Sequence, residues 1–397
     1  MDHLSLIYRD LTASLKTTAD NNNNSLLCGD WGILLYLFYY EHYIDGDADN
    51  ALDLLQQLYS RLDETGAEGY TFCNGLTGPF WMLHHLNQQG IVEIDLDALV
   101  NGFLPAAIAE SEQHLKENNF DFLHGSTGIV HFLVHFAHIP HVKDHLCLFV
   151  TALKQMARFQ NNTISFPTFT SLQHPHATDG LSMAHGSCAL LVILARLHQA
   201  GVVPEACKEL IYGNIALILQ GRNVEGIPSS PYASLYPEAL NGKASWSRLS
   251  WCYGDLSVAL ALWHCGNYFG EESWCREAIA IVSYNTCRTI EYSGVKDSCL
   301  CHGAAGAAII FRKFWKETGI ASFYDSSEYW FQQVLADPSF ETHQQQNGLR
   351  VATVASHIYR SNLLSGSAGV GLALLSKVQD RLPAWSGCFL IDHITDI

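Results

Sequence analysis

Strongly apolar stretches alternate with amphipathic ones along this chain. The most apolar stretches, in which nearly every position is hydrophobic, are residues 33–40, 129–136, 189–196 and 307–314. A helix that is apolar nearly all round is buried on several sides. In segments such as 51–59 and 146–159, apolar residues recur every three or four positions and the other positions are polar. These segments predict helices that face water on one side.

A short step of the form Gly-x-x-Gly, or a close variant, precedes a markedly apolar stretch seven times. The first glycines of these steps are Gly29, Gly75, Gly125, Gly186, Gly254, Gly303 and Gly366. Successive steps lie between 46 and 68 residues apart, which leaves room for two helices and two loops. The repeat therefore predicts seven helix pairs, each with an inner apolar helix and an outer amphipathic one.

Seven such pairs predict an all-α fold of the α/α-toroid class, a double ring of seven inner and seven outer helices. An open solenoid is the alternative, but it needs polar capping repeats, whereas the first and last repeats here are as apolar as the middle ones. Glycines permit close backbone approach where the inner helices begin, and the N–H groups of helix N-termini carry partial positive charge. We expect the functional site at that end of the helices.

Composition places the chain among soluble globular proteins, with 48% hydrophobic and 15% charged residues. Its formal net charge of −17 disfavours binding to nucleic acids or anionic lipid surfaces. The N-terminal residues lack the pattern of a secretory signal, and no run of 18 apolar residues occurs. The 12 cysteines are spread through a large chain, which favours reduced thiols in a cytoplasmic protein without membrane insertion.

Side chains of the types that bind metal ions lie just before two of the glycine steps. Cys252 lies two residues before Gly254, and Cys301 and His302 lie directly before Gly303. Two cysteines and a histidine are ligands that zinc prefers, and three protein ligands leave the fourth tetrahedral position open to a substrate. Because the two cysteines lie 49 positions apart, a fold must assemble such a site. The alternative is that either cysteine is a buried core residue.

Two loops flank the fourth repeat. Residues 163–180 carry His174, Pro175 and His176, whose histidines are either metal ligands or surface-loop residues. Residues 221–247 are rich in Gly, Pro, Ser and Asn and show little helical periodicity. We interpret the second segment as a long loop near the mouth of the site, because long loops in compact proteins are often functional.

Together these motifs resemble the lanthionine synthetase C-like (LanC) cyclases. The resemblance rests on the seven glycine steps and on Ala-His-Gly at 184–186, Trp-Cys-Tyr-Gly at 251–254, Cys-His-Gly at 301–303 and Pro-Ala-Trp at 383–385. It covers nearly the whole chain and implies a single LanC-like α/α-toroid domain over residues 1–397. It also implies one Zn²⁺ ion per chain, bound by Cys252, Cys301 and His302.

The resemblance further implies a set of catalytic residues. His185 matches the family histidine of acid–base catalysis, and Asp121 matches an aspartate that orients a histidine or positions the peptide. Arg248 would stabilise the charge of an enolate, and Tyr253 would line the site. The residues alone leave other interpretations open: Asp121 as a helix cap, Arg248 as the partner of a carboxylate and Tyr253 as a core residue.

The function implied is that of a lanthipeptide cyclase. Such an enzyme adds cysteine thiolates to dehydroalanine or dehydrobutyrine in the same peptide, forming lanthionine or methyllanthionine thioether rings. The expected substrate is a dehydrated precursor peptide, and a dehydratase and an exporter are candidate partners. Two alternatives are a LanC-like enzyme that adds glutathione to dehydroamino acids and a zinc-stabilised peptide-binding scaffold without catalysis. The same zinc site would serve either enzyme.

Overall fold

The computed structural model describes two compact units, each built mainly of helices. Unit 1 comprises Met1–Leu99 and Val295–Pro383, and unit 2 comprises Val100–Gly294 and Ala384–Ile397. The prediction of a single domain over residues 1–397 stays a prediction. The structure describes residues 2–17, 23–65, 69–166, 180–223, 233–240, 246–336 and 361–395.

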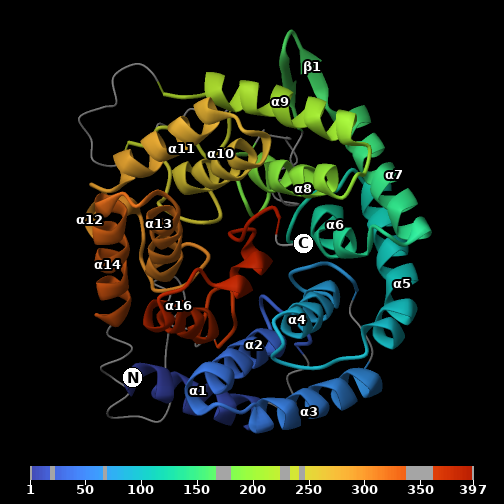
Figure 1. Ribbon diagram of the computed structural model, residues 1–397, viewed down its shortest axis with the longest axis vertical. Helices are drawn as coiled ribbons and strands as arrows, with labels where there is room; N and C mark the ends of the chain where they lie inside the picture. The colour runs from blue at the N-terminus through green and yellow to red at the C-terminus, as the bar shows by residue number, and fades with distance from the viewer. Residues whose placement is uncertain are drawn as a thin grey trace. The chain divides into compact units, whose positions relative to one another are not determined.

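In unit 1, helices from both ends of the chain pack together (Figure 1). Helix α14 packs along α13, and α16 contacts α1, α2 and α13. Every residue of α2 is buried, as its apolar sequence predicts. The elements are α1 (Asp2–Thr17), α2 (Asp30–Tyr40), the π-helix η1 (Glu41–Asp45), α3 (Asp49–Thr65), α4 (Thr77–Gln88), α13 (Ala304–Thr318), α14 (Ala321–Leu335) and α16 (Ser367–Gln379).

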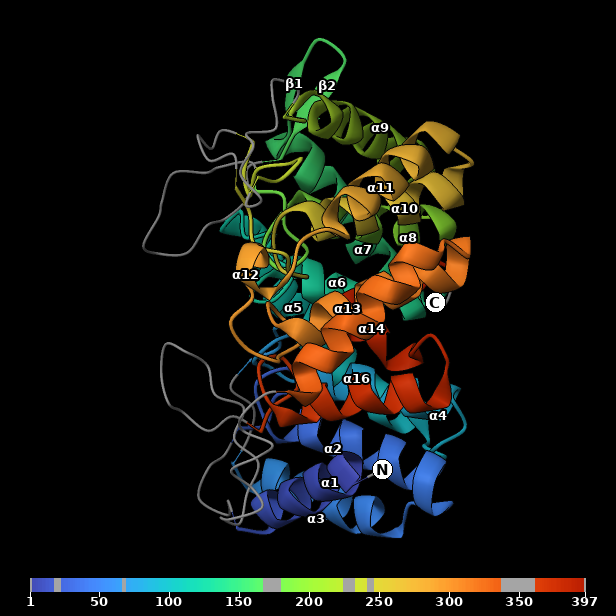
Figure 2. The ribbon, with the colours of Figure 1, turned by 90° about the vertical axis from the view of Figure 1, so that its left-hand side faces the viewer.

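Unit 2 is built around helix pairs in which α9 packs on α8 and α11 on α10, with α8 beside α10. A short antiparallel hairpin of β1 and β2 lies against α9 (Figure 2). The elements are most of α5 (Leu96–Lys116), α6 (Ser126–Leu133), η2 (Val134–Phe136), α7 (Pro140–Met156), β1 (Arg158–Gln160), β2 (Thr163–Ser165), α8 (Ser187–Gln199), α9 (Pro204–Gln220), α10 (Asp255–Phe269), α11 (Glu272–Asn285), α12 (Ile290–Ser293) and η3 (Ala384–Phe389).

The predicted apolar helices are present, but one amphipathic helix is shorter than predicted. The four apolar runs fall in α2, α6 with η2, α8 and α13. The periodicity of residues 146–159 predicted a helix as far as Phe159, whereas α7 ends at Met156 and Phe159 pairs with Ile164 in the hairpin. Asn161 between the two strands adopts a left-handed conformation with φ +53°, which asparagine tolerates in tight hairpin turns.

All seven glycine steps lead directly into a helix, as predicted. The helices that follow them are α2, α4, α6, α8, α10, α13 and α16. The turn before each helix folds back onto it so closely that a side chain would not fit. A Cβ atom at Gly306 would lie 2.0 Å from the main-chain oxygen of Leu300, and one at Gly369 would lie 2.1 Å from that of Leu363. Glycine is therefore required at these positions by packing.

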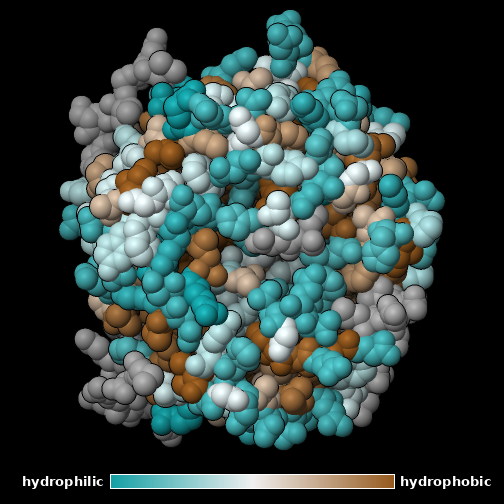
Figure 3. Space-filling model, in the orientation of Figure 1, coloured by the Kyte–Doolittle hydropathy of each residue, from teal (hydrophilic) through white to brown (hydrophobic). Residues whose placement is uncertain are grey.

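The helices of the described residues were compared with the length and hydropathy that a membrane-spanning helix requires. None of the helices there is both long enough and apolar enough to cross a membrane. On the face shown in Figure 3, hydrophilic side chains are interspersed with smaller apolar groups. Exposed large apolar side chains such as Leu148 on α7 and Val378 on α16 come from different elements, and single exposed residues of this kind need no special explanation.

We predict that Gly369→Ala lowers the free energy of unfolding by about 2 to 3 kcal/mol, because the new methyl group would collide with main-chain atoms that cannot rotate away. Gly102→Ala is the matched control, since a Cβ there meets no atom within 4 Å and alanine favours a helix interior by up to about 1 kcal/mol. Urea denaturation of the two variants measures both effects. Equal stability of the two variants would contradict the packing argument.

Candidate active site

The predicted acid–base pair lies together in unit 2. His185 Nδ1 is 2.6 Å from Asp121 Oδ2, and the exposed fractions of the two side chains are 30% and 5%. The other carboxylate oxygen of Asp121 accepts the main-chain N–H of His124 at 2.7 Å. Helix α6 begins after Gly125 without a side-chain cap. Asp121 therefore braces the turn before α6 and holds the ring of His185, and it does not cap the helix.

Burial and the charge of Asp121 shift the pKa of His185 in opposite directions. Burial lowers the pKa of His185, but the hydrogen bond to Asp121 and its negative charge raise the pKa by more, so that it lies above its ordinary value. The ring of His124 lies 6.0 Å from that of His185 and nearly parallel to it. Burial, with the charge of His185 adding to it, lowers the pKa of His124 despite the opposing effect of Asp121. Of the two histidines, His185 is therefore the one suited to carry a proton near neutral pH.

Ser182 connects the turn of His185 to the turn of Cys252. Its hydroxyl oxygen accepts the main-chain N–H groups of Ala184 at 3.0 Å and His185 at 2.8 Å. The same hydroxyl donates to the main-chain oxygen of Cys252. The two segments are 70 residues apart in sequence, and this one buried side chain fixes both. No periodic signal in the sequence marks Ser182, and it was not among the predicted site residues.

Tyr253 lies beside His185, as expected of a residue that lines the site. The two ring centroids are 6.1 Å apart, and the tyrosine side chain is half-buried. Burial, with the negative charge of Cys252 next, raises the pKa of Tyr253 to about 12. Its hydroxyl is therefore protonated at neutral pH and able to donate a hydrogen bond. Ser250 fixes the main chain here, because its hydroxyl donates to the oxygen of Tyr253 at 3.1 Å.

Arg248 lies on the segment that leads to Cys252 and is half-buried. Among the residues that the structure describes, its guanidinium has no hydrogen-bond or ion-pair partner, so the interpretation of Arg248 as the partner of a carboxylate finds no support there. The segment itself is held by Arg288, which donates to the main-chain oxygen of Ser247 at 2.6 Å. Arg248 is therefore a cation whose main chain is fixed and whose catalytic role stays a prediction.

A second group of polar side chains, in unit 1, surrounds His302. His302 Nε2 lies 3.2 Å from Asp297 Oδ2, and Asp297 Oδ1 accepts the main-chain N–H of Cys299 at 3.0 Å. The sulfur of Cys299 accepts the main-chain N–H of His302 at 3.5 Å. Potential ligand atoms of Asp297, Cys299 and His302 lie within 4.8 Å of one another, so unit 1 contains a candidate metal-binding group. In the same unit, the main-chain N–H of Cys301 donates to Leu364 at 3.0 Å.

Asp297 occupies a position that carries asparagine in two other repeats. Asn23, Asn119 and Asp297 each lie six residues before the first glycine of their step. The side-chain amides of Asn23 and Asn119 donate to the main-chain oxygen of the residue before that glycine, at 3.0 and 2.9 Å. A carboxylate has no hydrogen to donate, so Asp297 holds the ring N–H of His302 instead. Asp297 was not among the predicted site residues, although this change from asparagine to aspartate marks it in the sequence.

The seven predicted site residues are therefore distributed over both units. Unit 2 contains Asp121, His185, Arg248, Cys252 and Tyr253, and unit 1 contains Cys301 and His302. Within unit 2 the structure brings Asp121, His185 and Tyr253 together. The common ligation of a metal by Cys252, Cys301 and His302 stays a prediction. The predicted alternative ligands His174 and His176, with Pro175, lie outside the described residues, as do parts of the 221–247 loop.

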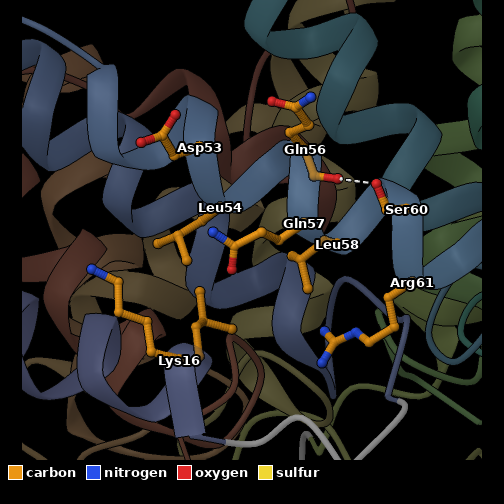
Figure 4. Close-up of a pocket in the computed structure, with 9 residues that line it drawn as sticks. Lys16, Asp53, Leu54, Gln56, Gln57, Leu58, Ser60 and Arg61 are labelled. Carbon is orange, nitrogen blue, oxygen red and sulfur yellow. Dashed lines mark hydrogen bonds between the residues drawn. The ribbon is translucent and has the colours of Figure 1, made fainter.

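A separate pocket in unit 1 lies between α1 and α3 and has a volume of about 600 Å³ (Figure 4). Three of its polar side chains have partners: Arg61 binds Asp30 at 2.7 Å, and the Ser60 hydroxyl donates to the main-chain oxygen of Gln56 at 3.0 Å. Lys16 donates to Asn50 at 3.3 Å. None of the predicted site residues lines this pocket.

Comparison with known proteins agrees with the fold and the motifs. The sequence matches the family described as "Lanthionine synthetase C-like protein" over residues 20–390. No match was found among curated proteins. The structure is similar to that of "Nisin cyclase", with a TM-score of 0.75, 18% sequence identity and coverage of 97% of this chain and 96% of that chain. This likeness confirms the predicted fold class, an all-α fold of the α/α-toroid type.

We predict that Asp121→Asn lowers the pKa of His185, because the negative charge that opposes burial is removed. A titration of isotope-labelled histidines by nuclear magnetic resonance measures this pKa directly. His198, which hydrogen-bonds to Tyr268, is the internal control and should titrate unchanged. An unchanged pKa of His185 in the variant would contradict the role assigned to Asp121.

The same pair makes stability depend on pH in a defined direction. Because the folded-state pKa of His185 is raised above its ordinary value of 6.5, its protonation stabilises the fold below pH 6.5, and this contribution is lost as pH rises through the raised pKa. The difference in the free energy of unfolding between the wild type and Asp121→Asn should therefore be larger just below pH 6.5 than above the raised pKa of His185.

Proposed function

The chain belongs to the lanthionine synthetase C-like protein family, and from this we propose that it is a zinc-dependent lanthipeptide cyclase. Its substrate would be a dehydrated precursor peptide that carries cysteines together with dehydroalanine or dehydrobutyrine. The reaction would be the intramolecular addition of a cysteine sulfur to the β-carbon of a dehydroamino acid. We further propose that residues 1–397 act as one domain in this reaction.

The observation that carries the proposal is the pair of Asp121 and His185. Addition of a thiolate to a dehydroamino acid produces an enolate, which must take up a proton at its α-carbon. His185 can supply that proton. Asp121 accepts the hydrogen bond of Nδ1–H and so fixes the orientation of the ring, which leaves Nε2 to transfer the proton. The raised pKa of His185 keeps a larger share of it protonated near neutral pH.

The proposed reaction balances without an external reagent. One carbon–sulfur bond forms and the carbon–carbon π bond breaks, while the thiol proton is lost and one proton is gained at the α-carbon. The thiol proton passes to solvent when the thiolate forms, and protonated His185 donates a proton to the α-carbon and is then protonated again by solvent. The cation of Arg248 and the hydroxyl of Tyr253 would stabilise the oxygen of the enolate between these steps. The peptide therefore keeps its mass while it loses a free thiol.

The three proposed metal ligands are of types that suit a zinc ion. Cys252, Cys301 and His302 are the ligand types that zinc prefers, and a zinc-ligating histidine commonly donates its second ring N–H to a carboxylate, as His302 does to Asp297. Bound zinc would hold the substrate cysteine as a thiolate at neutral pH, where a free thiol with a pKa of about 8.5 is mostly protonated. Because Nε2 of His302 faces Asp297, Nδ1 would be the nitrogen that binds the metal.

We predict that the zinc-loaded protein, incubated with a dehydrated cysteine-containing peptide and glutathione, removes the free thiol of the peptide at unchanged peptide mass. The thioether ring would consume the thiol without adding atoms. Alkylation after the reaction, followed by mass spectrometry, detects both quantities. Replacement of His185 by Gln should slow the reaction by about 10²- to 10⁴-fold while zinc remains bound, since only the proton donor is lost.

Other outcomes of this experiment separate the remaining functions. A mass increase equal to one glutathione would show addition of glutathione in place of cyclisation. No change in peptides of several sequences, with zinc confirmed by elemental analysis, would favour the non-catalytic scaffold. Cys301→Ala serves as the metal-site control and should lose zinc and cyclisation together. Full ring formation by this variant without metal would refute the proposed zinc site.

We predict that Asp297→Asn weakens zinc binding by about 10- to 100-fold while the fold is retained. An asparagine at this position can form the same main-chain contact as Asn23 and Asn119, so the turn is preserved, but the ring of His302 loses its carboxylate. Competition with a coloured zinc chelator measures the affinity, and circular dichroism of the metal-free protein tests the fold. Asp30→Asn removes another buried carboxylate of unit 1 and should leave zinc affinity unchanged.

Zinc affinity equal to that of the wild type in Asp297→Asn would show that the carboxylate does not position His302. A loss of affinity in both variants would indicate a general loss of stability in unit 1. Neither result depends on turnover, so the role of Asp297 is testable even if the peptide substrate differs from the one proposed.

A further inference from the structure

Two cysteines that the proposed reaction does not use lie together in unit 1. Cys28 directly precedes Gly29 at the start of α2, and Cys73 lies in the turn before α4. Their sulfur atoms are 3.5 Å apart, although the residues are 45 positions apart in sequence. Both turns are fixed by hydrogen bonds: Asn23 donates to the main-chain oxygen of Cys28 at 3.0 Å, and Gly75 donates its N–H to Thr71 at 3.0 Å. The contact between the sulfurs is therefore built into two ordered turns.

The two thiols differ in their access to solvent. Cys73 is 1% exposed, whereas Cys28 is only partly buried. Thiol–disulfide exchange requires one thiolate that a small disulfide can reach and a second thiol that can reach the resulting mixed disulfide. Cys28 fits the first requirement and Cys73 fits the second. A pair of thiols that served only as core filling would need no exposed member.

The same geometry does not favour a metal site. A structural zinc site takes four ligands, and a catalytic one takes three from the protein. Among the described residues, no third His, Cys, Asp or Glu forms a ligand cluster with Cys28 and Cys73. Asp30, two residues beyond Cys28, is engaged by Arg61 at 2.7 Å. The contact between the two sulfur atoms at 3.5 Å is better suited to the formation of a bond between them.

We propose that Cys28 and Cys73 form a reversible disulfide by exchange with a small-molecule disulfide such as oxidised glutathione. The thiolate of Cys28 attacks one sulfur of that molecule and releases the first glutathione. The thiolate of Cys73 then attacks the sulfur of Cys28 and releases the second. Two protein thiols are oxidised, one small disulfide is reduced to two thiols, and the two protein protons pass to the glutathione products. The new bond would join the turn before α2 to the turn before α4.

The test is to incubate the reduced, zinc-loaded protein with oxidised glutathione, quench with acid, alkylate the remaining thiols and map the peptides. We expect one linked peptide pair that contains Cys28 and Cys73, and its loss after treatment with dithiothreitol. The control is the pair Cys188 and Cys265 in unit 2, both fully buried, whose pKa values burial raises. These two should be alkylated in full after unfolding, whether or not glutathione was present.

Single substitutions separate the attacking thiol from the resolving one. In Cys73→Ser the exchange should stop at the first step, so that Cys28 retains one glutathione. In Cys28→Ser we expect Cys73 to remain unmodified, because the small disulfide cannot reach it. Circular dichroism of each variant confirms that it is folded, and Cys73→Ala replaces Cys73→Ser if the hydroxyl proves too costly to bury.

Three results would overturn the proposal. The first is a wild-type protein in which Cys28 carries glutathione but never forms a link with Cys73. The second is full alkylation of both thiols after exposure to oxidised glutathione. The third is a linked pair that contains Cys28 with a different cysteine. The peptide map of the wild type distinguishes all three without any substitution, and none of them bears on the proposed cyclase reaction.

Discussion

The rest of the structure depends on the close contact between each glycine step and the turn before it. At Gly306 and Gly369 the preceding turn comes so near that only a hydrogen atom fits between the main chains. This contact fixes where the helix begins. It therefore also fixes the position, relative to the helix, of the residue that precedes the first glycine of the step. Different repeats then present different side chains from the same position: His185 before α8, His302 before α13 and Cys28 before α2. One packing constraint thus creates a series of equivalent positions for chemistry.

What each position does is decided by the side chains that brace its turn. An asparagine can both donate and accept, so Asn119 satisfies the main chain within its own turn. A carboxylate only accepts, and it therefore binds whichever N–H group is near. Asp297 binds the ring of His302 in its own repeat, whereas Asp121 reaches the ring of His185 in the next repeat. A carboxylate in the turn thus supports a histidine ring, either in place of the asparagine, as Asp297 does, or beside it, as Asp121 does.

Much of the fold follows from the sequence, because glycine spacing and apolar runs are local signals. The starts of α2, α8 and α13 lie where the steps predict them. The hairpin after α7 was missed because the apolar periodicity continues to Phe159, whereas the helix itself ends at Met156 and the chain turns back at Asn161. In the site, residue types and family resemblance pointed to His185 and Asp121, which are 64 positions apart. Ser182 was missed because its role depends on a main-chain partner 70 positions away, whereas Asp297 was missed although an aspartate replaces the asparagine of two other repeats.

The two histidines next to Asp121 show how the fold selects a proton carrier. His124 is more exposed than His185, but burial by itself lowers the pKa of each. The carboxylate of Asp121 gives one oxygen to the ring of His185 but gives the other to the main-chain N–H of His124. Only His185 therefore gains a hydrogen bond that favours its charged form, and its pKa rises while that of His124 falls. The turn before α6 thus determines which histidine has the raised pKa, because the main-chain N–H of His124 in that turn occupies the second oxygen of Asp121.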